Sequence, residues 1–291
     1  MSTKSTPSNK PAVCLVRSSR TDVIGLAETM RRMFSDLRAS LHTGLQLATR
    51  DIHGLYRQNI LGFAWILLPP IVTTALWLGL SQAGIAVVRT DSGMPYPVFL
   101  TLGTLLWSLF TDALNTPRLQ VAGNMGTLAN ISFPPESVIV SGIMQIILNF
   151  TVRLLLLIGV AAWFEYLPSL WSPALALAAL YILLLGTALG VFLIPFTTIY
   201  KDIGQMLNLG IPLLMYTAPV VYGVPQQGLL RYLMLANPLT YAFNAARSCI
   251  DGVFVSTDLI ALAALTPLAI AALLAAWAIF RITLPHLVER G

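Results

Sequence analysis

The stretch at residues 50–70, RDIHGLYRQNILGFAWILLPP, constrains the fold more than any other part of the chain. Its first third carries charged and polar side chains that require water, whereas from Ile60 to about Leu80 the chain is apolar apart from two threonines. About 20 apolar residues are enough for one helix to cross a bilayer, so this segment is predicted to leave an aqueous surface and enter a membrane. Pro69 and Pro70 should kink that helix, and the carbonyl groups that they free must find partners inside the protein.

Composition supports a membrane protein. The chain has 291 residues, of which 56% are hydrophobic and only 10% are charged, whereas about 25% are charged in a typical soluble domain. The net charge of +5 comes mostly from residues before position 60. Such a basic segment suits the anionic inner face of a membrane, and the chain lacks the aromatic-interleaved basic patches that stack nucleic-acid bases. No nucleic-acid partner is therefore expected.

Long apolar runs bounded by polar residues recur along the chain at helical spacing. Asp112, near the end of the second run, is expected at the membrane interface, and Gly186 and Gly190 in the fourth should let another helix approach closely. The predicted fold class is an all-α membrane protein with six transmembrane helices. Their expected positions are 60–79, 96–114, 138–164, 173–199, 203–222 and 259–280.

The segment before the first run divides into two parts. Residues 1–21 are rich in Ser, Thr, Pro and Lys and are expected to form a disordered tail. Residues 22–59 place apolar side chains at helical spacing opposite basic ones, which predicts amphipathic helices that lie in the membrane interface or pack on a protein surface. Gly44 is expected to separate two such helices, and the transmembrane domain then covers 60–285.

The distribution of basic residues predicts the orientation. An even number of spans places both termini on one side, and that side holds most of the 17 Lys and Arg residues. Lys and Arg accumulate in cytoplasmic loops, so both termini are expected in the cytoplasm.

Arg153 is the one basic residue deep within an apolar run. An arginine at the centre of a bilayer costs about 2.5–3.5 kcal/mol on insertion scales, so this side chain should avoid lipid. Counting back in steps of four gives Asn149, Gln145 and Ser141, which lie on the same face of a helix. This polar stripe either lines a path for a hydrophilic substrate or forms a hydrogen-bond network that holds helices together.

Residues 223–252 contain two apolar runs that are too short to cross, at 229–235 and 239–250. Asn237 and Pro238 lie between them, as an N-cap followed by proline at the first helical position would. The pattern predicts two short helices that dip into the membrane and return to the same side. The alternative is an ordinary surface loop with two helices.

Catalytic and cofactor signals are missing from the sequence. There is no paired carboxylate within the apolar runs, no Ser-His-Asp set, and no cluster among the three His and two Cys residues that could bind a metal. The phosphate-binding pattern GxxxxGK[ST] is also missing, because the dipeptide Gly-Lys never occurs. We therefore expect no metal, no cofactor and no enzymatic activity in this chain.

A set of short motifs spans residues from about 45 to 285 in a characteristic order. They are Arg50-Asp51, Tyr56-Arg57, Leu61-Gly62, Trp65, Pro69, Phe133-Pro134, Glu136, Tyr200-Lys201-Asp202-Ile203, Ala218-Pro219-Val220-Val221-Tyr222 and Asn237-Pro238-Leu239. With them the chain resembles the membrane subunit of ABC exporters for bacterial surface polysaccharides, namely the O-antigen, capsule and teichoic-acid permeases. The departures are the segment before residue 44 and Lys201, where the family often has arginine.

The resemblance implies a homodimer in the bacterial cytoplasmic membrane, with two ATP-binding-cassette subunits that carry ATP and Mg²⁺. It implies an interface helix at 45–59, with Arg50, Asp51, Tyr56 and Arg57. It also implies a cytoplasmic coupling helix at 118–128, and re-entrant helices at 223–252 that shape an outer gate. The residues assigned to ATPase coupling are Arg118, Gln120, Asn124, Lys201 and Asp202. Those assigned to the outer gate are Pro219, Pro225, Asn237, Pro238 and Arg247.

The leading functional hypothesis is a permease that passes a lipid-linked polysaccharide through a channel between two subunits. Sugars bind by stacking on aromatic rings and by hydrogen bonds, so the expected lining combines the polar stripe with aromatic residues. These aromatic residues are Trp65, Trp77, Trp107, Tyr216 and Tyr222, although aromatic residues near span ends more often form interfacial belts. The alternatives are an ABC exporter of a drug or small lipid, and an intramembrane transferase, which the lack of acidic or His clusters disfavours.

Overall fold

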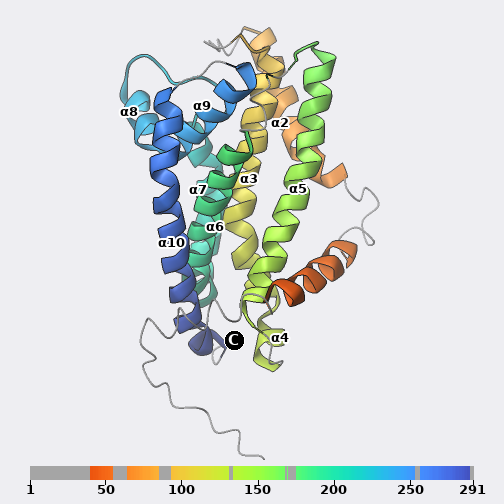
Figure 1. The fold of residues 1–291 in the computed structure, drawn as a ribbon, viewed down its shortest axis with the longest axis vertical. Helices are drawn as coiled ribbons and strands as arrows, with labels where there is room; N and C mark the ends of the chain where they lie inside the picture. Colours follow the sequence, from red (N-terminus) through yellow and green to blue (C-terminus); the bar gives the residue numbers. More distant parts are fainter. Residues whose placement is uncertain are drawn as a thin grey trace, which may run out of the picture.

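A computed structural model describes residues 40–54, 64–84, 93–130, 134–167, 169, 175–252 and 256–288, and every regular element within these ranges is helical (Figure 1). The first helix covers 40–54. It is followed by α2 (Ala64–Gln82), α3 (Tyr96–Gly123), α4 (Met125–Asn130), α5 (Glu136–Trp163), α6 (Leu175–Ile199), α7 (Lys201–Leu214), the 3-10 helix η2 (Met215–Thr217), α8 (Leu229–Ala236), α9 (Pro238–Asp251) and α10 (Ser256–Val288). The predicted all-α fold class is confirmed.

Five of these helices, α2, α3, α5, α6 and α10, are long and apolar enough to cross a membrane. The predicted fifth run is different. Its helix α7 has 14 residues and a length of about 21 Å, which is shorter than the roughly 30 Å hydrocarbon core. The run continues through η2 and a bend at 218–222, so Pro219 and its neighbours divide it. The expected count of six continuous spans is therefore not reached in the described chain.

The two ends of the molecule carry different helices. The helix α4 and the last turns of α10 lie at one end, called here the α4 end, and α8 and α9 lie at the other, the α9 end (Figure 1). The 40–54 helix packs across α5 towards the α4 end. The predicted break at Gly44 is wrong, because this helix continues through it. A Cβ atom at Gly44 would lie 2.6 Å from Val140 Cγ1, so glycine serves close packing on α5 instead.

Several predicted features lie outside the described residues. They are the tail at 1–21, the first amphipathic run up to residue 39, and positions 55–63, which include Tyr56 and Arg57.

The helix α3 is the centre of the fold. Within the most apolar window of each span, 78% of α3 and 56% of α6 are buried, against 11% of α2. The two central helices meet at glycine, because a Cβ atom at Gly190 would lie 2.5 Å from the Leu114 carbonyl oxygen. At Gly186 it would lie 2.6 Å from Ala113 Cβ. The close approach expected at these glycines is confirmed.

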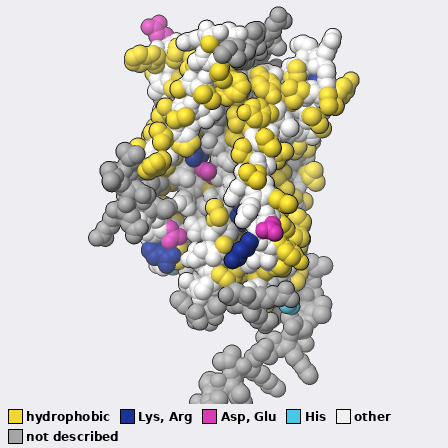
Figure 2. Space-filling view, turned by 180° about the vertical axis from the view of Figure 1, so that it is seen from behind, with side chains coloured by type: hydrophobic (Ala, Val, Ile, Leu, Met, Phe, Trp, Pro, Cys, Tyr) yellow, Lys and Arg dark blue, Asp and Glu magenta, His cyan; other side chains and the backbone are white. Residues whose placement is uncertain are grey.

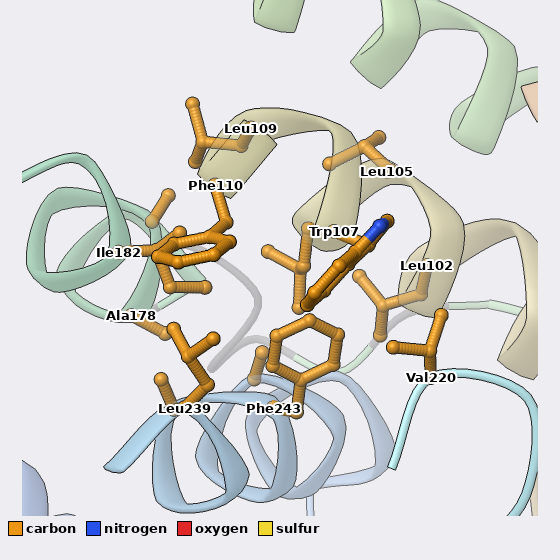
Figure 3. Packing of buried hydrophobic residues seen from close by; sticks show 14 of the residues in the cluster. Leu102, Leu105, Trp107, Leu109, Phe110, Ala178, Ile182, Val220, Leu239 and Phe243 are labelled. Atoms are coloured by element: carbon orange, nitrogen blue, oxygen red, sulfur yellow. The ribbon is translucent and has the colours of Figure 1, made fainter. Parts of the chain in front are cut away.

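The core is completed by α9. Figure 3 shows Trp107 and Phe110 of α3 packed with Ile182 of α6 and with Leu239 and Phe243 of α9. Burying a large apolar side chain contributes about 1.5–3 kcal/mol, which makes α9 a structural part of the bundle rather than a surface loop. The two short helices predicted at 229–235 and 239–250 are confirmed as α8 and α9.

The outer helices expose their apolar side chains. Figure 2 shows hydrophobic side chains over much of one face, with charged side chains few and mostly in its lower half. Large exposed residues include Leu68, Val72 and Leu76 of α2, and Leu155 and Ile158 of α5. A protein surrounded by water rarely leaves such continuous apolar surface uncovered, so these faces suit lipid or another chain.

Candidate functional site

The polar stripe of α5 faces other protein elements. Ser141 is buried, and its hydroxyl donates to Asp51 Oδ2 of the 40–54 helix at 3.3 Å. Gln145 Oε1 accepts a hydrogen bond from Gln120 Nε2 of α3 at 3.1 Å. The stripe therefore joins three helices near the α4 end.

Arg153, the innermost member of the stripe, is buried and ion-paired. Its Nη1 lies 2.6 Å from Asp112 Oδ2 of α3. Asp112 was expected near the end of its span, whereas α3 continues to Gly123 and places this residue near the middle of the helix. Arg153 Nε also donates to the carbonyl oxygen of Ile66 in α2 at 3.3 Å.

The contact to Ile66 has a backbone cause. Pro70 lacks an N–H, so the Ile66 carbonyl four residues earlier has no helical donor. An unpaired carbonyl is costly inside a membrane, and the guanidinium supplies the missing donor. Arg153 thus holds α2, α3 and α5 together, which is the helix-joining alternative considered for the stripe.

A polar hollow, called here the inner cavity, lies beside the stripe. It has a volume of about 760 Å³ and opens to the surface. Polar side chains of the 40–54 helix, α3 and α5 form much of its wall. The lining residues are Arg50, Asp51, Gly54, Thr116, Leu119, Gln120, Gly123, Asn124, Gln145 and Asn149.

A second hollow, called here the α3 groove, has a volume of about 360 Å³ and lies between α2, α3 and α7. It combines one large aromatic residue, Trp107, with hydroxyl and amide groups. Its polar lining residues are Thr73, Thr104, Ser108, Thr111, Asn115 and Asn208, and the others are Pro69, Pro70, Trp107, Ile211, Pro212 and Met215. This face was not predicted from the sequence, although the spacing of Thr104, Ser108, Thr111 and Asn115 follows one side of a helix.

The predicted aromatic lining does not come together. Of the five residues, only Trp107 lines the α3 groove. Trp65 is 54% exposed at the start of α2, and Trp77 packs against the core. Tyr216 is exposed, and its carbonyl oxygen accepts the Tyr222 hydroxyl proton at 2.6 Å. These positions do not form one continuous surface.

The boundary predicted for the coupling helix is wrong. Residues 118–123 are the last turns of α3, Asn124 is its C-cap, and a separate helix α4 begins at Met125. Arg118 is buried, and its Nη2 donates to Asn115 Oδ1 at 2.6 Å and to Asn208 Oδ1 of α7 at 2.8 Å. It therefore joins α3 to α7 rather than lying on a docking surface.

The other residues assigned to coupling lie either in the inner cavity or on the exposed surface. Gln120 accepts a hydrogen bond from Asn124 Nδ2 at 3.2 Å, and both line the inner cavity. Lys201 and Asp202 are exposed where α6 ends and α7 begins. On the 40–54 helix, Arg50 Nη2 pairs with Asp51 Oδ1 at 2.8 Å.

Asn237 is the N-cap of α9, as predicted. Its side-chain oxygen accepts the Leu239 N–H at 3.0 Å, and Pro238 occupies the first turn. Its Nδ2 donates to the Thr217 carbonyl oxygen at 3.2 Å, which ties α9 to η2. Pro219 is buried, and Pro225 is half-buried in the connection to α8.

Arg247 of α9 is buried beneath the bend at 218–222. Its Nη2 donates to the Val220 carbonyl oxygen at 3.1 Å, and its guanidinium carbon lies 3.5 Å from the centre of the Phe99 ring. Nearby, the Tyr166 hydroxyl donates to Asp251 Oδ1 at 2.5 Å. Burial and this hydrogen bond raise the pKa of Tyr166.

The α4 end contains a further ion pair that sequence analysis did not identify. Glu136, in the first turn of α5, is buried and accepts a hydrogen bond from Trp277 Nε1 of α10 at 3.3 Å. Arg281 Nε lies 3.4 Å from the same carboxylate oxygen. Among the residues that the structure describes, no group of three His, Cys, Asp or Glu side chains could hold a metal ion.

Comparison with known proteins agrees with this architecture. One protein that the chain is similar to is the O-antigen export system permease protein RfbA of Myxococcus xanthus, with 26% identity over 203 residues, which cover 67% of this chain and 75% of that protein. Residues 45–250, well over half of the chain, match the ABC-2 type transporter family. Together with its membrane-spanning helices, this match shows that the chain is a multi-pass membrane protein of the ABC-2 type transporter family.

Proposed function

We propose that this chain is the permease subunit of an ATP-driven exporter that moves a lipid-linked cell-surface polysaccharide, such as O antigen or capsule, across the bacterial cytoplasmic membrane. The family match supports a transport subunit, and the name of the Myxococcus relative supports a polysaccharide as the substrate. The observation that carries the proposal is the α3 groove, which offers sugar-binding chemistry on a helix that spans the membrane.

The groove suits a glycan for two reasons. A sugar ring has an apolar face that packs on apolar and aromatic surfaces, and the groove offers Pro69, Pro70 and the 8% of Trp107 that the core leaves exposed. Sugar hydroxyl groups both donate and accept hydrogen bonds, as do the hydroxyls of Ser108 and Thr111 and the amide of Asn115. No charged side chain is among the lining residues described, so a neutral polymer can slide without being held at one point.

A homodimer would close the groove into a channel. The helices on its two rims, α2 and α7, both carry large exposed apolar side chains. On α2 these include Ile71 and Val72, and on α7 they include Met206, Leu209 and Leu213. In this proposal the same faces of a second copy cover them, and the two grooves face each other across the dimer axis.

The α4 end is cytoplasmic in this proposal, with both termini, and two separate ATP-binding subunits dock there. The short helix α4, with the exposed Lys201 and Asp202, replaces the predicted 118–128 segment as the docking surface. Because the sequence lacks a phosphate-binding loop, ATP and Mg²⁺ are held by the partner subunits.

The test is reconstitution of the permease with its ATPase in lipid vesicles. We expect ATP hydrolysis to be stimulated by lipid-linked polysaccharide, and not by free lipid or by drug-like cations. The permease alone should hydrolyse no ATP above background. Stimulation by a small lipid or drug, with none by lipid-linked glycan, would overturn the substrate class; hydrolysis by the purified permease alone would overturn its role as a non-catalytic subunit.

A further inference from the structure

We propose that Arg153 is a positioning residue that keeps the first turns of α2 closed between the inner cavity and the α3 groove. The inference rests on the proposed function, because it divides the proposed glycan path into two compartments. A conformational step that moves α2 would then be needed to join them.

The two hollows lie on adjacent faces of α3. Successive residues of a helix are turned by about 100°, so Ser108, Thr111 and Asn115 share one face, which lines the groove. Thr116 and Gln120 lie about a third of a turn away and line the inner cavity. Asp112 falls between these two faces, and it is the residue that pairs with Arg153.

The start of α2 lies beside this border, because Arg153 contacts both Asp112 and Ile66. Pro69, Pro70 and Thr73 line the groove, whereas the lining described for the inner cavity includes no residue of α2. Ile66, one turn before Pro70, receives the hydrogen bond from Arg153 Nε. The contact therefore acts one turn before the groove-lining residues of α2, beside the border between the two hollows.

Arginine suits this position better than other residues. Its planar guanidinium presents several donors in fixed directions, so Nη1 can bind Asp112 while Nε binds the Ile66 carbonyl oxygen. The second bond exists because Pro70 leaves that carbonyl without a helical donor. A single ammonium group on lysine cannot reproduce both directions equally well.

The two bonds differ in strength. The bond to Asp112 is short and charge-assisted, at 2.6 Å, whereas the bond to Ile66 is 3.3 Å and has a neutral acceptor. Of these two bonds, a movement of α2 away from α3 has to break only the weaker one, and the ion pair between α3 and α5 stays intact. The hydrogen bond from Arg153 thus holds α2 reversibly, while the ion pair with Asp112 keeps Arg153 in place between α3 and α5.

Cysteine accessibility tests this tether. Cys14 and Cys249 are replaced by alanine, Thr111→Cys places a thiol in the groove, and a membrane-impermeant methanethiosulfonate reagent is added at the α4 end. A separate Lys201→Cys variant, at an exposed site there, identifies the vesicle orientation in which the reagent reaches that end. We expect slow labelling of position 111 with Arg153 present. In Arg153→Leu, labelling should be roughly tenfold faster or more, because the variant loses the hydrogen bonds that the charged guanidinium makes to Asp112 and Ile66.

Two further variants separate tethering from general stability. Pro70→Ala restores a helical N–H for the Ile66 carbonyl, so adding it to Arg153→Leu should recover thermal stability but leave labelling fast. Arg231→Leu removes an arginine whose described hydrogen bond goes to the Gln226 carbonyl oxygen, in the connection before α8. This variant should leave labelling slow. If Arg153→Leu fails to insert, Arg153→Lys carries the same comparison, with an intermediate rate expected.

The labelling assay needs neither glycan nor ATPase, so its failure is distinguishable from failure of the proposed function, which the reconstituted ATPase assay reports. Equal labelling rates in the parent and in Arg153→Leu, whether both slow or both fast, would overturn the proposal. A return to slow labelling in the double variant with Pro70→Ala would also overturn it, because the tether would then be unnecessary.

Discussion

Two buried arginines, one near the middle of the bundle and one at the α9 end, each supply a hydrogen-bond donor to a backbone carbonyl group. Arg153 of α5 and Arg247 of α9 are 7% and 6% exposed, and each donates to a carbonyl oxygen beside a proline-interrupted segment. The acceptors are Ile66 in the kinked start of α2 and Val220 in the bend after α7.

Their other partners differ. Arg153 has a carboxylate partner, Asp112, whose side chain is 25% exposed. Arg247 instead lies over the ring of Phe99, which is almost fully buried in the core. A pair with an accessible carboxylate can be altered by water and by neighbouring groups, whereas a guanidinium packed on an aromatic ring is fixed by its surroundings. The comparison indicates an adjustable inner contact and a rigid outer one.

The largest expected effect comes from removing the charge that balances the inner arginine. Asp112→Ala leaves a buried guanidinium that cannot lose its proton, and breaking such a pair costs about 3–5 kcal/mol. Thermal melting of the purified protein in detergent measures the loss. Arg153→Leu should cost less, because the remaining carboxylate is partly exposed, and the double variant should cost less than Asp112→Ala alone. If Asp112→Ala melts as the parent does, the pair does not stabilise the fold.

The rigid outer contact is tested at Gly103. A Cβ atom there would overlap the Val220 carbonyl oxygen and lie 3.0 Å from Arg247 Nη2. Gly103→Ala should therefore cost about 1–3 kcal/mol, as overpacking of a core does, and displace the bend. Gly159→Ala is the matched control, since no atom lies within 4 Å of its added Cβ, and it should gain up to about 1 kcal/mol. Similar melting of both variants would show that the outer region is not rigid.

A smaller effect is expected at the N-cap of α9, the helix that carries Arg247. Asn237→Ala removes the acceptor for the Leu239 N–H and should cost about 0.5–2 kcal/mol in the same melting assay. Asn244→Ala, within the same helix, serves as the control and should change stability by less than about 0.5 kcal/mol. A loss at Asn244 as large as that at Asn237 would contradict the capping role.

The smallest effect is expected at the exposed pair on the 40–54 helix. The Arg50 side chain is 60% exposed, so Arg50→Ala should change stability by only about 0.2–1 kcal/mol, and by less in high salt. Melting at low and at high salt measures this difference. A loss as large as that of Asp112→Ala would remove the distinction between exposed and buried pairs on which the comparison depends.

Much of the fold could be predicted because it depends on local signals. Apolar length identified the regions of five spans, and Asn237-Pro238 located the start of α9. The fifth run failed as a continuous span because hydropathy sums over residues and ignores the backbone interruption that ends α7 near Leu214. Gly44 was predicted to end a helix because glycine has a low helix propensity. The helix continues through it, since close packing on Val140 outweighs that propensity.

The candidate site was harder to predict because its partners are distant in sequence. Residues 115–123 are polar, which suggested a connection outside the membrane, yet they continue α3 and bury Arg118 against Asn208. For the same reason Asp112 was expected near the end of a span that stops at Leu114, whereas the helix continues to Gly123. Helical spacing alone placed Ser141, Gln145, Asn149 and Arg153 on one face, but only the structure shows that Arg153 bonds Asp112 and a carbonyl group of α2.

The central claim is that a glycan passes along the α3 groove, and the most direct measurement is surface polysaccharide in cells that carry a blocked groove. Ser108→Trp places a large side chain in a hollow of about 360 Å³, and Leu155→Trp places the same side chain on the exposed apolar face of α5. With permease present at equal levels in the membrane, we predict that Ser108→Trp abolishes surface polysaccharide while Leu155→Trp leaves it unchanged. Normal export by Ser108→Trp would contradict the account.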